Sequence, residues 1–244
     1  QFYYGGLTLG ADRGGSHAKL NLTGSGTSLS VPGLDTYGRN EIFIGGGAKF
    51  QTYSVQLGLQ TAGASNVVVI SGPGSSWTND HLMHFGMHSG GQTMIVTNGG
   101  HFKTGGSGFS DARFSALANT VGSKIIVTGE NSWFHSDGPA NIGLISGNTM
   151  RTLNNLILVT NGGRFWARQL TYGSSGSFPG TLLNVADGSM WIGSLAFAVG
   201  TLRVEAGSGT IDQLSMTGGT NAVIQTLGNL YVGHHGDLGA GELR

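Results

Sequence analysis

The octapeptide IVTNGGHF at residues 95–102 returns almost unchanged as LVTNGGRF at residues 158–165. In each copy, alternating side chains run into a glycine pair and then reach a large aromatic residue. Such alternation is typical of a β-strand with one buried face, and the glycine pair predicts a tight turn. Further copies of this pattern are LNLTGSG (20–26), IFIGGGAKF (42–50), VVISGPGSSW (68–77), IVTGENSW (126–133), VADGSMW (185–191), VEAGSGTI (204–211) and a degraded LGNL (227–230).

The copies recur every 19 to 32 residues, roughly, which lies within the range of solenoid repeats. A third limb of each coil ends in an apolar residue followed by glycine. These pairs are Leu57-Gly58, Phe85-Gly86, Ile142-Gly143, Tyr172-Gly173, Val199-Gly200 and Val232-Gly233. The sequence therefore predicts an all-β fold, a single-stranded parallel β-helix (β-solenoid) of about nine coils, as one domain over residues 1–244.

Stacked coils align equivalent residues into ladders. One inward ladder is expected to contain Leu22, Ile44, Ile70, Val96, Val127, Val159, Val185 and Val204. The Trp or Phe after each turn should form a second ladder, in which we expect Trp77 and Trp133 to be buried. Asn98 and Asn161 each precede a Gly-Gly pair, and we expect both in the left-handed backbone region, which asparagine tolerates.

Copies with serine before the aromatic residue, Ser76-Trp77 and Ser132-Trp133, alternate with Gly-Gly copies that lead to a phenylalanine. The underlying unit is therefore two coils, about 45 to 63 residues. This doubling resembles the glycine-rich β-strand repeats of bacterial autotransporter passengers, specifically the repeat associated with type V secretion and PEP-CTERM proteins. The resemblance covers nearly the whole chain and implies a right-handed β-helix, secreted or displayed on the bacterial surface, with a structural or adhesive role. The translocation barrel and sorting tail of such proteins are not part of this sequence.

Composition excludes several classes of protein. Glycine supplies 46 residues and proline 4, without the regular glycine at every third position that collagen requires. Twelve basic residues balance 12 acidic ones, so the basic excess of a nucleic-acid-binding protein is missing. Cysteine is absent, and packing and backbone ladders must hold the fold without disulfides. No apolar run approaches the length of a membrane span.

β-Helices also occur among polysaccharide lyases and glycosidases, which place clustered carboxylates on one face. The carboxylates of this chain are scattered singly, as at Asp80, Asp111, Glu130 and Asp137. We interpret them as solvated turn residues, and we predict no enzyme activity, no catalytic residue and no cofactor.

The segment HLMHFGMH at residues 81–88 is the strongest metal candidate, because His81, His84 and His88 are imidazole ligands close in sequence. In a strand, however, His81 would point to the opposite face from the other two. The adjacent pair His234-His235 is expected in a turn. We therefore predict no metal site.

Three other motifs resemble binding or modification sites. The glycine-rich stretches GGG (45–47) and GGSG (105–108) lack the Lys-Ser/Thr and the following helix of a phosphate-binding loop. In the sequon Asn21-Leu22-Thr23, Asn21 should point outward if Leu22 points inward. Phe165 and Trp166 are adjacent and must face opposite sides of a strand, so one ring is outward and could stack on sugars.

The ends of the chain match each other: YGGLTLG (4–10) aligns with LGNLYVG (227–233), and Leu20 then corresponds to Leu243. Either the chain is an excerpt of a longer solenoid or its open ends pair with neighbouring copies. The sequence thus predicts a non-enzymatic, secreted or cell-surface structural or adhesive solenoid, self-associating head to tail in an extracellular fibre. The alternative is a carbohydrate-active β-helix that binds or cleaves surface polysaccharide.

Overall fold

A computed structural model describes residues 6–10, 17–59, 65–86, 89–105, 112–114, 122–142, 155–172, 182–197, 200–216 and 222–233. Its regular structure consists of two sheets in which all paired strands are parallel. The described part of the chain contains no helix with the length and hydropathy of a membrane span. This arrangement confirms the all-β, parallel, solenoid-like prediction.

The larger sheet has 12 strands. They are β1 (Leu7–Leu9), β3 (Ser28–Thr36), β5 (Lys49–Leu57), β7 (Ser76–Asn79), β8 (Met83–Phe85), β10 (His101–Thr104), β11 (Ala112–Phe114), β13 (Trp133–Ile142), β15 (Arg164–Tyr172), β17 (Ser189–Phe197), β19 (Ser208–Met216) and β21 (Asn229–Val232).

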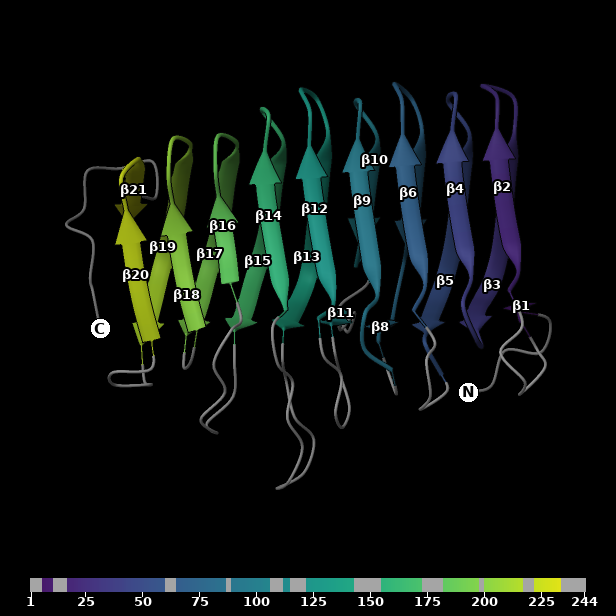
Figure 1. The fold of residues 1–244 in the computed structure, drawn as a ribbon, viewed down its shortest axis with the longest axis horizontal. Coiled ribbons are helices and arrows are strands. Elements are labelled where there is room, and N and C mark those ends of the chain that lie inside the picture. The colour runs from purple at the N-terminus through teal and green to yellow at the C-terminus, as the bar shows by residue number, and fades with distance from the viewer. Residues whose placement is uncertain are drawn as a thin grey trace.

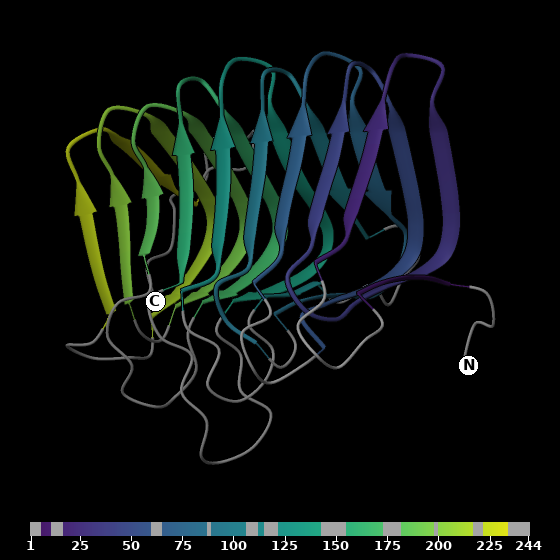
Figure 2. The same ribbon diagram turned by 45° about the vertical axis from the view of Figure 1, so that its right-hand side comes forward.

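The second sheet has nine strands. They are β2 (Lys19–Thr23), β4 (Glu41–Gly45), β6 (Val67–Ser71), β9 (Thr93–Thr97), β12 (Lys124–Thr128), β14 (Leu156–Thr160), β16 (Leu182–Val185), β18 (Gly200–Val204) and β20 (Ala222–Thr226). Figure 1 shows this sheet in front of the larger one, with a tight turn at the top of each coil. Figure 2 shows the two sheets as separate walls joined by these turns.

The core fills the space between the sheets, and the predicted inward ladder is confirmed. Strand register places each of its residues beside the next, from Leu22 through Ile44 and Val127 to Val204. All of its members are buried, because alternate residues of a strand face the same side.

A second column, the aromatic column, runs along the inner face of the larger sheet, and its members are buried except for Leu29 and Leu230 at its two ends, which are partly buried. Its members are Leu29, Phe50, Trp77, Phe102, Phe134, Phe165, Met190, Gly209 and Leu230. Trp77 is fully buried, as predicted, and its ring centroid lies 5.2 Å from that of Phe50 and 5.6 Å from that of Phe102. The expectation for Trp133 was wrong: Phe134 takes the inward place, and Trp133 faces outward beside His101.

Turn length explains this error. The turn from Val127 to Trp133 contains one residue more than the turn from Val96 to His101, although both end at the same register position. In the longer turns a hydroxyl holds the turn of the neighbouring coil: Ser75 Oγ accepts from Gly47 N, and Ser132 Oγ accepts from Gly99 N, each at 2.9 Å. The serine equivalent to Ser132 is therefore Ser75 and not Ser76, with which the sequence pattern had aligned it. A shift of one residue moves a side chain to the opposite face of a strand.

The corner residues follow the prediction. Asn98 and Asn161 have φ of 52° and 50°, in the left-handed region. The same region contains Asn131, two residues before Trp133 in a longer turn, with φ of 60°. The place of Asn98 is taken in that turn by Gly129, with φ of 89°.

The predicted alignment of the chain ends was wrong. Leu7 pairs with Leu34, at the later end of β3, whereas Leu230 pairs with Gly209, near the beginning of β19. The two segments therefore occupy different parts of a coil. Val232 likewise pairs with Ile211 and does not belong with the third-limb residues, of which Leu57 pairs with Phe85 and Ile142 with Tyr172. Val199 and Leu243 lie outside the described residues.

Candidate functional site

Two rows of outward side chains run across the strands of the larger sheet. We call the first the serine row: Ser28, Lys49, Ser76, His101, Trp133, Arg164, Ser189, Ser208 and Asn229. We call the second the tryptophan row: Ser30, Gln51, Thr78, Lys103, His135, Trp166, Trp191, Thr210 and Tyr231. Because the strands are in register, side chains from distant parts of the sequence lie side by side in each row.

Aromatic rings make a continuous series of contacts over the middle of these rows. His135 stacks on Trp166 with ring centroids 3.9 Å apart, and Trp166 stacks on Trp191 at 4.7 Å with only 13° between the planes. Trp133 joins the series edge-on to His135 at 5.3 Å and also contacts His101 at 4.8 Å. All these rings are partly exposed, so they form a solvent-facing aromatic surface.

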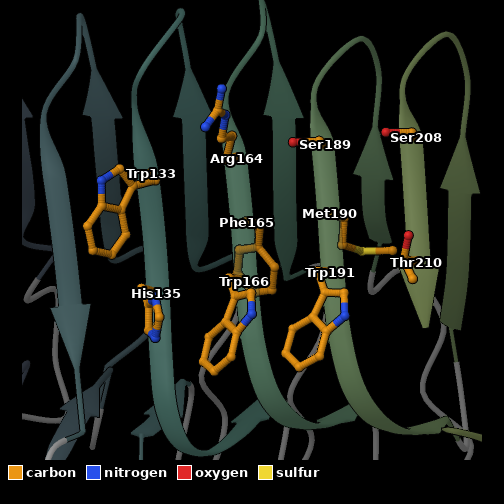
Figure 3. Close-up of a pocket in the computed structure, with 10 residues that line it drawn as sticks. All are labelled: Trp133, His135, Arg164, Phe165, Trp166, Ser189, Met190, Trp191, Ser208 and Thr210. Carbon is orange, nitrogen blue, oxygen red and sulfur yellow. The ribbon is translucent and has the colours of Figure 1, made fainter. Parts of the chain in front are cut away.

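A hollow of about 480 Å³ lies against this surface, and we call it the indole groove. Its lining consists of Trp133, His135, Arg164, Phe165, Trp166, Ser189, Met190, Trp191, Ser208 and Thr210. Figure 3 shows Trp133, Arg164, Ser189 and Ser208 in one line and His135, Trp166, Trp191 and Thr210 in the other. Its volume falls in the range of about 300–1,000 Å³ that is usual for ligand pockets.

Small residues create this hollow. Ser189 and Ser208 continue the serine row beyond Arg164, so their short side chains leave space where a large residue would fill it. Thr210 follows Trp191 in the tryptophan row. Trp166 covers one face of the Trp191 indole, and the opposite face is turned toward this small threonine. One indole face is therefore accessible from the groove.

A glycine lets the Trp191 indole lie close to its own strand. A Cβ atom at Gly193 would lie 3.0 Å from Cη2 of Trp191 and 2.6 Å from the carbonyl oxygen of Arg168. The absence of a side chain at Gly193 thus removes an obstacle beneath the indole, and the strand and its neighbour hold the ring in place.

The charged group beside the aromatic surface is an ion pair. Asp137 Oδ2 lies 2.8 Å from Lys103 Nζ, and Asp137 Oδ1 lies 2.6 Å from His135 Nε2. Partial burial raises the pKa of the Asp137 carboxyl, but the hydrogen bonds from Lys103 and His135 outweigh it, so that the pKa lies below its ordinary value. Asp137 is therefore an anion that fixes the position of the His135 ring.

The predicted metal candidates do not come together in the described residues. His81 stacks on Tyr53 with ring centroids 4.9 Å apart, whereas His84 is in β8 between the buried Met83 and Phe85. No group of three His, Cys, Asp or Glu side chains suited to a metal ion is found in the ranges given above. His88, His234 and His235 lie outside the described residues.

The carboxylates that the sequence analysis named are separate from each other. Asp80 accepts a hydrogen bond from Gln51, Glu130 is in the turn before Trp133, and Asp137 forms the ion pair described above. Asp111 lies outside the described residues. Burial raises the pKa of the Asp35 carboxyl, whose register neighbours are Thr8 and Gln56 and not a second acid.

Sequence reasoning missed a buried amide ladder at the start of the nine-stranded sheet. Asn66 Oδ1 accepts from the backbone N–H of Asn40 at 3.1 Å and from Asn40 Nδ2 at 2.9 Å. Gln92 Oε1 accepts in the same way from Asn66, at 2.9 Å and 2.7 Å. A polar residue directly before β4, β6, β9, β12 and β14 was the available signal. We assign this ladder a structural role, because it satisfies buried amide groups between the coils.

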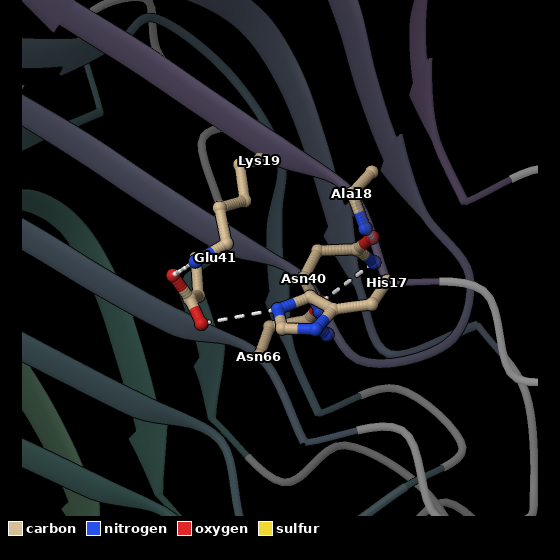
Figure 4. A network of polar contacts seen from close by, with 6 residues as sticks. All are labelled: His17, Ala18, Lys19, Asn40, Glu41 and Asn66. Atoms are coloured by element: carbon tan, nitrogen blue, oxygen red, sulfur yellow. Dashed lines mark hydrogen bonds and ion pairs between the residues drawn. The ribbon is translucent and has the colours of Figure 1, made fainter.

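Figure 4 shows the first member of this ladder and the ion pair beside it. Asn40 Oδ1 accepts from the backbone N–H of Ala18 at 3.0 Å. On the outside, Glu41 lies 2.8 Å from Lys19 and 3.0 Å from His17. The hydrogen bond from Lys19 lowers the pKa of Glu41. This pair is solvent-exposed and contributes little to stability.

Two outward predictions are confirmed. In β2, Asn21 is exposed while Leu22 is buried, so the sequon asparagine faces solvent. In β15, Phe165 is buried and Trp166 is partly exposed, so Trp166 is the outward ring of that pair. Comparisons with protein families, with curated proteins and with solved structures gave no match to this chain.

Proposed function

We propose that this chain is a non-enzymatic, extracellular adhesive solenoid that binds polysaccharide in the indole groove. The observation that carries the proposal is the stack of Trp166 and Trp191 beside a hollow bordered by serine side chains. The C–H faces of a sugar ring pack on an indole as other apolar surfaces do, while its hydroxyl groups need polar partners such as Ser189 and Ser208.

Parallel ladders make the groove a rigid site. His135, Trp166 and Trp191 come from three successive strands, and backbone pairing fixes their order and spacing. A binding site on strands is more precisely organised than one on loops. Less conformational freedom is then lost when a ligand binds.

The charges around the groove favour binding over catalysis. Hydrolysis of a glycosidic bond needs two carboxyl groups across the bond, one of them an acid with a raised pKa. Neither the serine row nor the tryptophan row contains Asp or Glu. The nearby Asp137 has a lowered pKa and is held by two partners, which makes it a poor proton donor.

The proposal also covers the handedness of the solenoid, its number of coils and its location. We take the solenoid to be right-handed, because crossovers between parallel strands are right-handed in about 98% of cases. A count of nine coils is supported by the nine-stranded sheet. The extracellular location rests on the resemblance to autotransporter passenger repeats, which are secreted or surface-displayed.

Binding can be tested with immobilised and soluble polysaccharides, followed by calorimetry and tryptophan fluorescence. We expect Trp191→Ala and Trp166→Ala to weaken binding at least about tenfold, which corresponds to 1.4 kcal/mol. A matched control is Phe43→Ala, which removes an exposed aromatic residue from the outer face of the other sheet. Equal affinity of Trp191→Ala and the unmodified protein would refute the groove as the site.

A second proposal is head-to-tail association, and the shape of the sheet edges favours it. At one edge β1 pairs with the later part of β3 alone, and at the other β21 extends along the early part of β19 alone, so the two edges have complementary shapes. β21 of one copy could therefore pair with Ser28–Val31 of the next. Leu230 and Ile224 at the second edge are only partly buried, unlike the core residues of the middle coils.

Paired charges test this joint. If β21 continues the sheet beside β3 of the next copy, Tyr231 lies next to Ser30 in the tryptophan row. Lysine at both positions places like charges side by side and should abolish fibres, whereas Ser30→Asp with Tyr231→Lys should restore them. Sedimentation velocity and electron microscopy measure fibre formation by the two double variants. Identical association of the two double variants would contradict this joint.

A further inference from the structure

We infer that the indole groove is selective for acidic polysaccharide, with the Arg164 guanidinium pairing with the carboxylate of a uronate residue. This inference rests on the proposed function, since it concerns the ligand of the same site. It starts from the charge of the surface around the groove.

The outer face of the larger sheet is basic where the groove lies. The serine and tryptophan rows contain Lys49, His101, Lys103, His135 and Arg164 and no acidic residue, although the chain as a whole is balanced in charge. Asp137 lies beside these rows and pairs with Lys103 and His135, so among the described residues Arg164 supplies the unpaired positive charge at the groove. A surface with a net positive charge attracts anionic ligands. The face therefore favours an anionic ligand.

Within the groove, Arg164 is the cation that the protein leaves available. Lys103 and His135 are both held by Asp137. Arg164 is exposed and forms no ion pair within the described ranges of the chain. Asp187, in the turn that precedes Ser189, already accepts hydrogen bonds from Thr160 and from the backbone N–H of Asn161.

The position of Arg164 suits one sugar ring that contacts both groups. Arg164 and Ser189 are register neighbours, and Trp191 is two residues beyond Ser189 on the same strand. Strand geometry places the Cα atoms of Arg164 and Trp191 about 8 Å apart. A pyranose ring on the free face of Trp191 lies on the Thr210 side of the indole, one strand further from Arg164. We expect its C5 carboxylate and the guanidinium to meet across the space that Ser189 and Ser208 leave open.

A carboxylate is the favoured anion because its geometry matches the guanidinium. A planar guanidinium donates two parallel hydrogen bonds to a planar carboxylate. A uronate thus provides an apolar ring face for the indole and a planar anion for Arg164.

The test compares polygalacturonate with its methyl ester, which has the same backbone without the charge. Affinities are measured by calorimetry at low ionic strength with a chelator present. We expect polygalacturonate to bind about tenfold more tightly than the ester, and the difference should shrink in 0.5 M salt because salt screens the ion pair. Arg164→Gln should abolish the difference in affinity between the two ligands.

Two further variants separate this inference from the proposed function. Arg168→Gln removes the same charge from the same strand outside the groove and should keep the preference for polygalacturonate. Trp191→Ala should weaken both ligands. Equal affinity of the unmodified protein for the two ligands, a preference retained by Arg164→Gln, or tighter binding of a neutral-backbone sulfated glycan would overturn the uronate inference. If Trp191→Ala instead binds both ligands as tightly as the unmodified protein does, the proposed function is overturned.

Discussion

Replacement of Trp77 with alanine probes the aromatic column at its largest side chain. The Trp77 ring is fully buried between Phe50 and Phe102, and its Nε1–H donates to Thr52 Oγ1 at 2.9 Å. Truncation of a buried tryptophan to alanine destabilises a protein by about 3–5 kcal/mol. We expect the upper part of this range, because the neighbouring coils are fixed by backbone pairing and cannot collapse into the cavity.

The measurement is urea denaturation followed by far-ultraviolet circular dichroism. Trp77→Phe keeps an aromatic ring in the column and loses the hydrogen bond, so it should be destabilised by only about 1–2 kcal/mol. Trp133→Ala, on the outer face, should cost about 1 kcal/mol or less. If Trp77→Ala and Trp133→Ala reduce the free energy of unfolding equally, the inward and outward assignments of these residues are incorrect.

Three other perturbations address the turns, the amide ladder and the ion pair. Gly163→Ala should destabilise the protein by about 1–3 kcal/mol, because its Cβ would lie 2.7 Å from the carbonyl carbon of Val127 in the preceding coil. Gly26→Ala, with open space around it, should be neutral in the same denaturation assay. Asn66→Ala should cost about 2–3 kcal/mol, since two amide donors of Asn40 lose their acceptor, and exchange of the Asn40 backbone amide should accelerate. Because the pKa of Asp137 is lowered in the folded protein, its carboxylate stabilises the fold at pH values above the ordinary aspartate pKa of about 3.9. This stabilisation is lost as the pH falls through the lowered pKa. Asp137→Asn should therefore flatten the decline of the unfolding midpoint between about pH 5 and pH 2.

Alternation and repeat phase were sufficient to predict the inner ladder from the sequence. Each strand of the smaller sheet from β2 to β18 has two inward apolar residues, and the second of them, which precedes the turn, is Leu, Ile or Val; only in β20 does a polar residue, Thr226, take this place. An error of one residue would place a polar side chain in the core, so only one register is compatible with the pattern. For this reason Leu22 and Val204, at opposite ends of the ladder, were both placed correctly.

The aromatic residues after the turns were harder to place. The backbone between the two sheets contains a variable number of residues, and the sequence shows an aromatic residue after both long and short turns. Only the hydrogen-bonded hydroxyl, Ser75 in one coil and Ser132 in another, shows where the second strand begins. Alignment on the last serine before the aromatic residue therefore misplaced Trp133 by one position.

The buried amide ladder and the indole groove could not be predicted for a different reason. Both depend on contacts between coils, and a single copy of the repeat contains only one member of each row. Asn66 has no evident role until Asn40 and Gln92 are known to lie above and below it.

Turn length connects the fold to the proposed function. In the coil that begins at Val127, the longer turn directs Trp133 outward and Phe134 inward. In the coil that begins at Val185, the turn is shorter than in the preceding coil, so Met190 enters the core and Trp191 faces solvent beside Trp166. A change of one residue in a turn thus decides whether a large ring stabilises the core or contributes to a binding surface. Because the neighbouring strands fix the register, the turn can change in length without disturbing the ladders. A change in turn length therefore alters both the inward and the outward residue of a coil, while the strands keep their pairing.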